Sequence, residues 1–259
     1  MSPTIDTTYL TGLYWMVPLL LLLIGLQRLV NGEIIAVLLL LTRSNKWTIW
    51  IFSFLFLPGV FLHELSHWIM AKVLGVRTGR VSLIPKLLPD GTLRMGFVEI
   101  YPKDHVREAL IGLAPLIFGG IAVAFIGLTQ LELDLVWGSA MAGIWNPFVE
   151  VVRATMARPY FWWWFYALFV VSNTMMPSPS DRRAWLPIIL FIVILVFMTI
   201  GLGAGPWLFQ TTMPALNQAM LAMATVFGTS AVIHALLYGP IWLFRGLLNR
   251  ITGLEVRTR

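Results

Sequence analysis

The chain has 259 residues, of which 58% are hydrophobic and only 12% are charged. This composition excludes an ordinary soluble globular domain and a disordered chain, and it predicts a polytopic membrane protein. Cysteine is absent, which excludes disulfides and thiolate metal ligands. The net charge of +6 comes without a basic and aromatic motif, so we expect attraction to an anionic lipid bilayer and no nucleic-acid partner.

Six segments are apolar enough to be transmembrane helices, each of which needs about 20 residues. In chain order they are residues 9–27, 47–74, 109–128, 160–176, 184–204 and 219–244. Residues 34–42 are too short to span unless they are tilted, re-entrant or part of a longer bent helix. The fourth segment begins with aromatic residues from Tyr160 to Trp164, which is typical of a membrane interface. We therefore expect an all-α polytopic membrane protein with about six transmembrane helices.

Lysine and arginine predict the orientation of these segments. Of the 18 basic residues, 13 lie within residues 72–107, at Arg182 and Arg183, or from Arg245 onward. The positive-inside rule makes these three regions cytoplasmic, with Arg43 and Lys46 as exceptions. A charge-free turn near residues 205–212 then belongs on the opposite side.

The run His63-Glu64-Leu65-Ser66-His67 lies inside the second apolar segment. On a helix, residues four apart share a face, so His63 and His67 can bind one metal ion with Glu64 beside them. Such a short pattern can arise by chance, and a membrane histidine often only bonds to another helix. However, a charged residue at mid-bilayer costs about 2.5–3.5 kcal/mol even on the insertion scale, so this glutamate needs a function to explain it. We interpret the run as a zinc site with a general base.

A catalytic zinc usually takes three protein ligands, so a third His, Asp or Glu must come from elsewhere. The candidates are Asp104, His105, Glu108, Asp181 and His234. Asp181 has the most unusual surroundings, because Pro177 and Pro179 must interrupt a helix that has just crossed the membrane. Broken backbone at membrane depth is tolerated where it lines a protein cavity. This break therefore favours Asp181, while His234 is expected either to make a packing hydrogen bond or to act as a gate.

These residues resemble the site-2 protease family of intramembrane zinc metalloproteases, which pair an H-E-x-x-H helix with a later Asn-x-x-Pro...Asp-Gly segment. Asp181 follows Asn173 by eight positions and Pro179 follows it by six, as in that family. Pro177 is displaced by one position from the family pattern, and Arg182 stands where the family has glycine. Gly112-Leu113-Ala114-Pro115 looks like the family's Gly-Pro-containing middle helix. The resemblance covers about residues 55–184.

The resemblance implies an intramembrane zinc metalloendopeptidase that hydrolyses peptide bonds of membrane-spanning substrates. Zinc would be held by His63, His67 and Asp181. Glu64 would act as general base on the zinc-bound water and then as general acid toward the leaving amine. Asn173 is a tentative oxyanion or substrate contact, and a helix-to-helix hydrogen bond is an equal alternative for it.

Residues 79–101 predict a β-hairpin, because strand-like stretches at 81–84 and 92–101 flank Pro89-Asp90-Gly91. It is either a simple connector or, as the resemblance implies, an edge that holds the substrate extended for hydrolysis. Residues 129–159, with few charges and several aromatic residues, are expected either to lie on the membrane surface and shield the site or to pack as a loop.

We expect three parts: an N-terminal membrane segment (residues 1–46), a catalytic membrane core with the hairpin (47–204), and a C-terminal transmembrane helix with a cytoplasmic tail (205–259). The active site would face the cytoplasmic side. Two other functions stay open. One is a zinc-binding relative that has lost proteolysis and acts as a membrane chaperone or quality-control factor. The other is a transporter in which the His, Glu and Asp residues form an ion or proton path.

Overall fold

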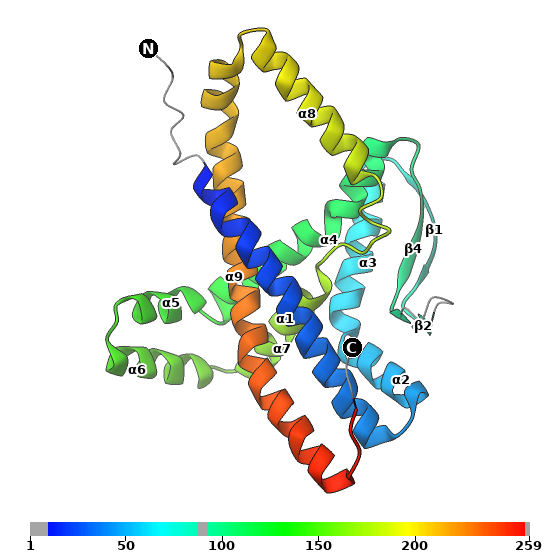
Figure 1. Cartoon of the computed structure of the whole chain (residues 1–259), viewed down its shortest axis with the longest axis vertical. Helices are drawn as coiled ribbons and strands as arrows, with labels where there is room; N and C mark the ends of the chain where they lie inside the picture. Colours follow the sequence, from blue (N-terminus) through cyan, green and yellow to red (C-terminus); the bar gives the residue numbers. More distant parts are fainter. Residues whose placement is uncertain (1–9, 88–92, 257–259) are drawn as a thin grey trace.

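Helices dominate the computed structural model, which describes residues 10–87 and 93–256 (Figure 1). The helices are α1 (Thr11–Thr42), α2 (Asn45–Leu55), α3 (Leu57–Val73), α4 (His105–Phe125), the π-helical turn η2 (Ile126–Gln130), α5 (Leu133–Met141), α6 (Trp145–Met156), α7 (Phe161–Thr174), α8 (Trp185–Gly201) and α9 (Gly205–Thr252). The strands are β1 (Arg77–Ser82), β2 (Lys86–Leu87), β3 (Leu93–Arg94) and β4 (Phe97–Tyr101). A mostly helical chain with a small antiparallel sheet was predicted and is confirmed.

Within the described residues, three helices are long and apolar enough to cross a membrane: α1, α4 with its extension η2, and α9. The bent pair of α2 and α3 makes a fourth if it counts as one span. The six expected spans are not confirmed, because α7 has only 14 residues and α8 only 17. Residues 11–27 and 34–42 do not form separate segments but belong to the single helix α1. The expected turn near residues 205–212 is instead the start of α9.

Helices α1 and α9 run parallel, side by side (Figure 1). Near their starts, the Gly12 amide donates to the Asn217 side chain at 2.7 Å. Near their ends, Arg245 Nε lies 3.0 Å from Glu33 Oε2 in a largely buried ion pair. The polar residues of α1 thus find partners on other helices, which explains why they do not break its helical run.

Basic residues gather at two ends of this fold. The end of α9, with Arg245, lies with the α1–α2 connection at the lower end of Figure 1, where Arg43 and Lys46 occur. The end of α3, the start of α4 and the start of α8 lie in its upper half, and strands β1 and β4 run downward from there to β2. The end of α9 therefore lies away from the end of α3 and the start of α4, while the side of the membrane on which each basic region lies stays a prediction.

Helices α2 and α3 meet at a bend of 65°. Pro58 lies in the first turn of α3, where its missing N–H leaves no helical hydrogen bond unmade. The carbonyl of Leu55 at the bend accepts a hydrogen bond of 2.6 Å from the Tyr166 hydroxyl of α7. A Cβ added at Gly59 would overlap the Val170 carbonyl oxygen, so this glycine lets α7 lie directly against α3.

The predicted β-hairpin is present and lies beside α3 (Figure 1). Strand β1 pairs antiparallel with β4, with Ser82 opposite Phe97, and β2 pairs with β3, with Lys86 opposite Arg94. The predicted turn at Pro89-Asp90-Gly91 lies outside the described residues.

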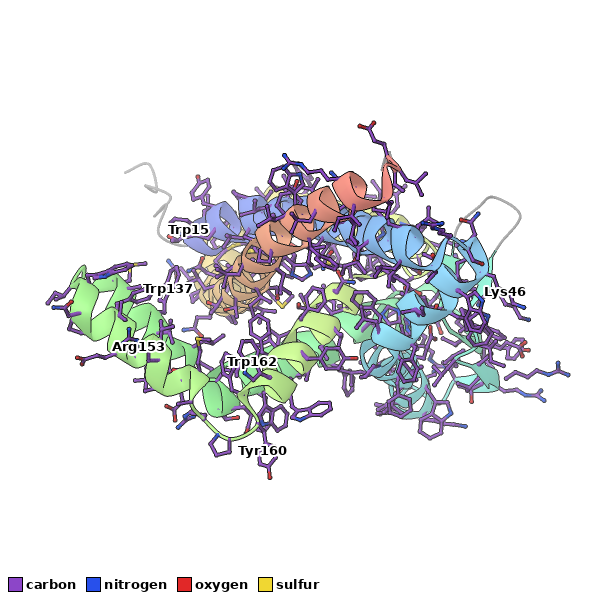
Figure 2. The ribbon with its side chains drawn as sticks, turned by 90° about the horizontal axis from the view of Figure 1, so that it is seen from below. Trp15, Lys46, Trp137, Arg153, Tyr160 and Trp162 are labelled. Atoms are coloured by element: carbon purple, nitrogen blue, oxygen red, sulfur yellow. The ribbon has the colours of Figure 1, made fainter. Side chains whose placement is uncertain are left out.

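Helices α5 and α6 form a hairpin that projects from the side of the molecule away from α3, as both views show (Figures 1 and 2). Trp137 and Arg153 lie on this hairpin in Figure 2, and no residue of α5 is buried. The hairpin therefore does not shield the histidine helix, which had been one expectation for residues 129–159. Tyr160 and Trp162, at the start of α7, are exposed, as is usual for an interfacial aromatic cluster.

Candidate metal centre

Three of the predicted site residues come together. His63 and His67 stand on one face of α3, and Asp181 approaches them from the segment between α7 and α8. The two histidine Nε2 atoms are 3.2 Å apart. Asp181 Oδ1 lies 3.4 Å from His67 Nε2, and its Oδ2 lies 3.7 Å from His63 Nε2. One ligand atom from each residue fits within 4.8 Å of the other two, which makes the group compact enough for a single ion.

The other ring nitrogens determine which atoms face the centre. His63 Nδ1 lies 2.7 Å from the Thr174 carbonyl oxygen, and His67 Nδ1 lies 2.9 Å from that of Ile111. A carbonyl oxygen only accepts, so each Nδ1–H donates and each neutral Nε2 turns a lone pair toward the centre. Metal-bound histidines are held in this way.

Two facing lone pairs repel unless a cation or a proton lies between them. Nitrogen atoms bound to tetrahedral zinc at about 2.0–2.1 Å lie about 3.3 Å from each other, close to the spacing of the two Nε2 atoms. The donor set of two imidazoles and one carboxylate also suits zinc. The residues present therefore fit the predicted ion.

Asp181 is delivered by a short, restrained segment. Helix α7 ends at Thr174, and Pro177 and Pro179 prevent the helix from continuing. The Ser178 amide donates to Asp181 Oδ2 at 2.7 Å, and the Asp181 amide donates back to Ser178 Oγ at 3.3 Å. A Cβ at Gly112 of α4 would overlap the Asp181 carbonyl oxygen, so the segment reaches the histidines only because position 112 has no side chain.

Asp181 lies between the helices, in surroundings that favour its charged form. Burial by itself raises the pKa of this carboxyl, but where protons on the two Nε2 atoms take the place of the cation, hydrogen bonds from His63, His67 and the Ser178 amide together hold the pKa well below its usual range. The carboxylate is therefore ionised at neutral pH and available as a ligand.

Glu64, the predicted general base, is 8% exposed and lies beside the histidine pair on α3. The backbone of Gly96, between β3 and β4, covers it: a Cβ at Gly96 would lie 3.0 Å from Glu64 Cγ and 3.1 Å from Oε1. The contact of Gly96 with Glu64 was not predicted from the sequence, although a glycine inside a strand-like run often marks a close backbone approach. The Glu64 carboxyl is therefore sheltered by the hairpin on one side and borders a groove on another.

Asn173 belongs to a polar network rather than to the ligand group. Its side-chain amide is hydrogen-bonded to Asn31 of α1 at 3.1 Å and to His234 Nε2 of α9 at 3.2 Å. His234 is fully buried, and its Nδ1 lies 2.8 Å from the Ser230 carbonyl oxygen. These contacts favour the helix-to-helix hydrogen bond for Asn173, and an oxyanion role stays a prediction.

The remaining ligand candidates lie elsewhere. Asp104 caps α4 by accepting from the Arg107 amide at 2.9 Å, and His105 and Glu108 form an exposed pair at 3.5 Å. Asp181 is thus the candidate that the fold brings to the histidine pair. Comparisons of the chain with protein-family models, with curated proteins and with solved structures gave no match.

Proposed function

We propose that this protein is an intramembrane zinc metalloprotease that hydrolyses peptide bonds of membrane-spanning substrates. The observation that carries the proposal is the convergence of two oriented imidazole Nε2 atoms and one carboxylate beside the buried Glu64, among helices apolar enough to cross a membrane. Three protein ligands leave a tetrahedral ion one free position, which is the usual arrangement for catalysis.

Bound at these residues, zinc would lower the pKa of a water molecule toward about 7 and polarise the substrate carbonyl. Glu64 takes the proton from the attacking water and returns it to the leaving amine. The carbonyls of Thr174 and Ile111 keep the two imidazoles oriented throughout. The unpaired edge of β1 holds the substrate extended, because a peptide bond within a helix is closed off by its own hydrogen bonds.

In this proposal the protein is multi-pass and its site opens toward the cytoplasm. Asp181 directly precedes Arg182 and Arg183, and nine of the 18 lysines and arginines lie at these two positions or within residues 72–107. The positive-inside rule therefore favours the cytoplasm for the end of the fold that carries the site.

The direct test is the zinc content of the purified protein in detergent, by elemental analysis. We expect about one zinc per wild-type chain, little in His67→Ala and Asp181→Ala, and the wild-type amount in the matched control His105→Ala. A folded wild-type protein that takes up no zinc when zinc is supplied would overturn the proposal.

Proteolysis is tested with Glu64→Gln, which removes the base and keeps the ligands. Mass spectrometry of membranes that contain the wild-type protein should find peptide fragments with new ends inside apolar segments. We expect the Glu64→Gln variant to retain zinc and to produce none of these fragments. Identical fragments from both would exclude Glu64 as the base.

A further inference from the structure

An apolar groove lies between α3 and the hairpin, directly beside Glu64. Four of its residues share one face of α3, and two come from β1 and the residue after it. The lining residues are Phe61, Glu64, Leu65, Trp68, Val81 and Leu83, and the volume is about 240 Å³. Phe61 is 51% exposed and Val81 53%, so part of the apolar surface here has no partner among residues 10–87 and 93–256.

The opposite side of the histidine pair is closed. The gap lined by Gly59, His63, Pro115 and Thr174, where α3 meets α4 and α7, has no room for a water molecule. Gly112 and Asp181 are in contact nearby, which leaves no opening at that point. The groove, by contrast, borders Glu64, the predicted base, and has room for a substrate side chain.

We propose that this groove receives one large apolar side chain of the substrate, of leucine or phenylalanine size, next to the bond to be cleaved. The inference rests on the proposed proteolytic function and adds a substrate preference to it. The volume is below the roughly 300–1,000 Å³ of pockets that enclose drug-sized ligands, and so suits a single side chain.

The lining explains the choice of side chain. Apart from the Glu64 carboxyl and the Trp68 indole N–H the lining is apolar, so a polar side chain would lose hydration with few partners to replace it. An acidic side chain would also face the Glu64 carboxyl. Strand β1 pairs with β4 and has a second edge; a segment added at that edge would direct alternate side chains toward α3 and hence into the groove.

The probe is a series of peptide hydroxamates, which chelate zinc, with one backbone and a leucine, phenylalanine, glycine or aspartate side chain next to the hydroxamate. Affinities for the zinc-loaded protein in detergent are measured by competition. We expect the leucine and phenylalanine compounds to bind about tenfold or more tightly than the glycine compound, since burial of a large apolar side chain is worth at least this factor. The aspartate compound should bind no better than glycine.

The variant Val81→Trp fills the groove at an exposed position. It should abolish the preference for leucine over glycine while leaving the zinc content unchanged. The matched control Ile84→Trp adds the same side chain at an exposed position outside the lining and should behave as wild type. Trp68→Ala, which enlarges the groove, should shift the preference toward a tryptophan hydroxamate.

Equal affinities across the series, or a leucine preference that survives Val81→Trp, would overturn the pocket while leaving the protease proposal intact. Failure of every hydroxamate to bind the zinc-loaded wild-type protein would show that the bound ion has no open position, and would overturn the proteolytic function together with the pocket.

Discussion

At the scale of single residues, the metal centre depends on missing side chains as well as on ligands. Gly59 lets α7 approach α3, Gly112 admits the Asp181 backbone, and Gly96 brings the hairpin over Glu64. Each glycine is needed because a backbone or side-chain atom occupies the place of its Cβ. The ligands could not meet if these close approaches were lost.

Gly112→Ala tests this requirement. Its methyl group would overlap the Asp181 carbonyl oxygen and push the carboxylate from the histidines. We expect zinc affinity to fall about 10–100-fold, the usual effect of losing support for a metal ligand. Competition with a chelator of known affinity measures the change.

The control for this variant is Gly120→Ala on the same helix. There an added Cβ meets its nearest neighbours only at 3.9 Å and 4.0 Å, which is ordinary contact. Zinc affinity should be unchanged in Gly120→Ala, and equal affinities in the two variants would show that position 112 tolerates a side chain.

At the scale of elements, three consecutive residues of α7 are held by three other helices. The Ser172 carbonyl accepts from Gln27 of α1, Asn173 bonds to α1 and α9, and the Thr174 carbonyl accepts from His63 of α3. The network of Asn31, Asn173 and His234 thus lies one residue from a bond that orients a metal ligand. Its structural effect is to join α1 and α9 to α7, which in turn contacts the histidine helix α3.

A double-mutant cycle tests this network. His234→Ala and Asn31→Ala should each lower the Tm in detergent. Their effects on the free energy of unfolding should couple by about 0.5–2 kcal/mol, because both act through Asn173. His105→Ala, at an exposed position, should leave the Tm unchanged. Strictly additive effects of the two network variants would show that Asn173 does not link them.

At the scale of the whole molecule, the end of α9 lies away from the end of α3. The positive-inside rule, applied to the sequence, predicts one side of the membrane for both. Helix α9 runs parallel to α1, so it carries Arg245 to the end where α1 carries Glu33. The end of α3 and the start of α4 lie toward the opposite end. The parallel pairing of α1 and α9 therefore determines on which side the C-terminal helix ends.

Cysteine labelling tests this arrangement cleanly, because the natural chain has no cysteine. Lys103→Cys and Arg250→Cys replace exposed residues near the two ends. In sealed vesicles, a membrane-impermeant maleimide should label them from opposite faces, and both should react once the vesicles are opened with detergent. Labelling from one face would instead support the single basic side expected from the sequence, and would require another crossing between α8 and α9.

Much of the architecture follows from local pattern. The spacing of His63 and His67 places them on one helical face, and Pro177 and Pro179 end α7. The strand-like stretch at 92–101 predicts β4, whereas the stretch at 81–84 overlaps β1 only at Val81 and Ser82. Each of these features depends on neighbours in the chain, so the sequence alone is sufficient to predict it. The number of spans was not predictable in this way, because polar residues within α1 lower its hydropathy without breaking its helix.

The sequence by itself therefore determined a mostly helical membrane protein, the histidine helix with Glu64, and the broken segment that presents Asp181. Only the tertiary structure decided that Asp181 reaches the histidines past Gly112, that Thr174 and Ile111 orient both imidazoles, and that α1 and α9 run in parallel. The physical reason is the separation along the chain over which each interaction acts. Helical periodicity and proline geometry act over a few residues, whereas close packing joins surfaces whose partners lie far apart in the chain.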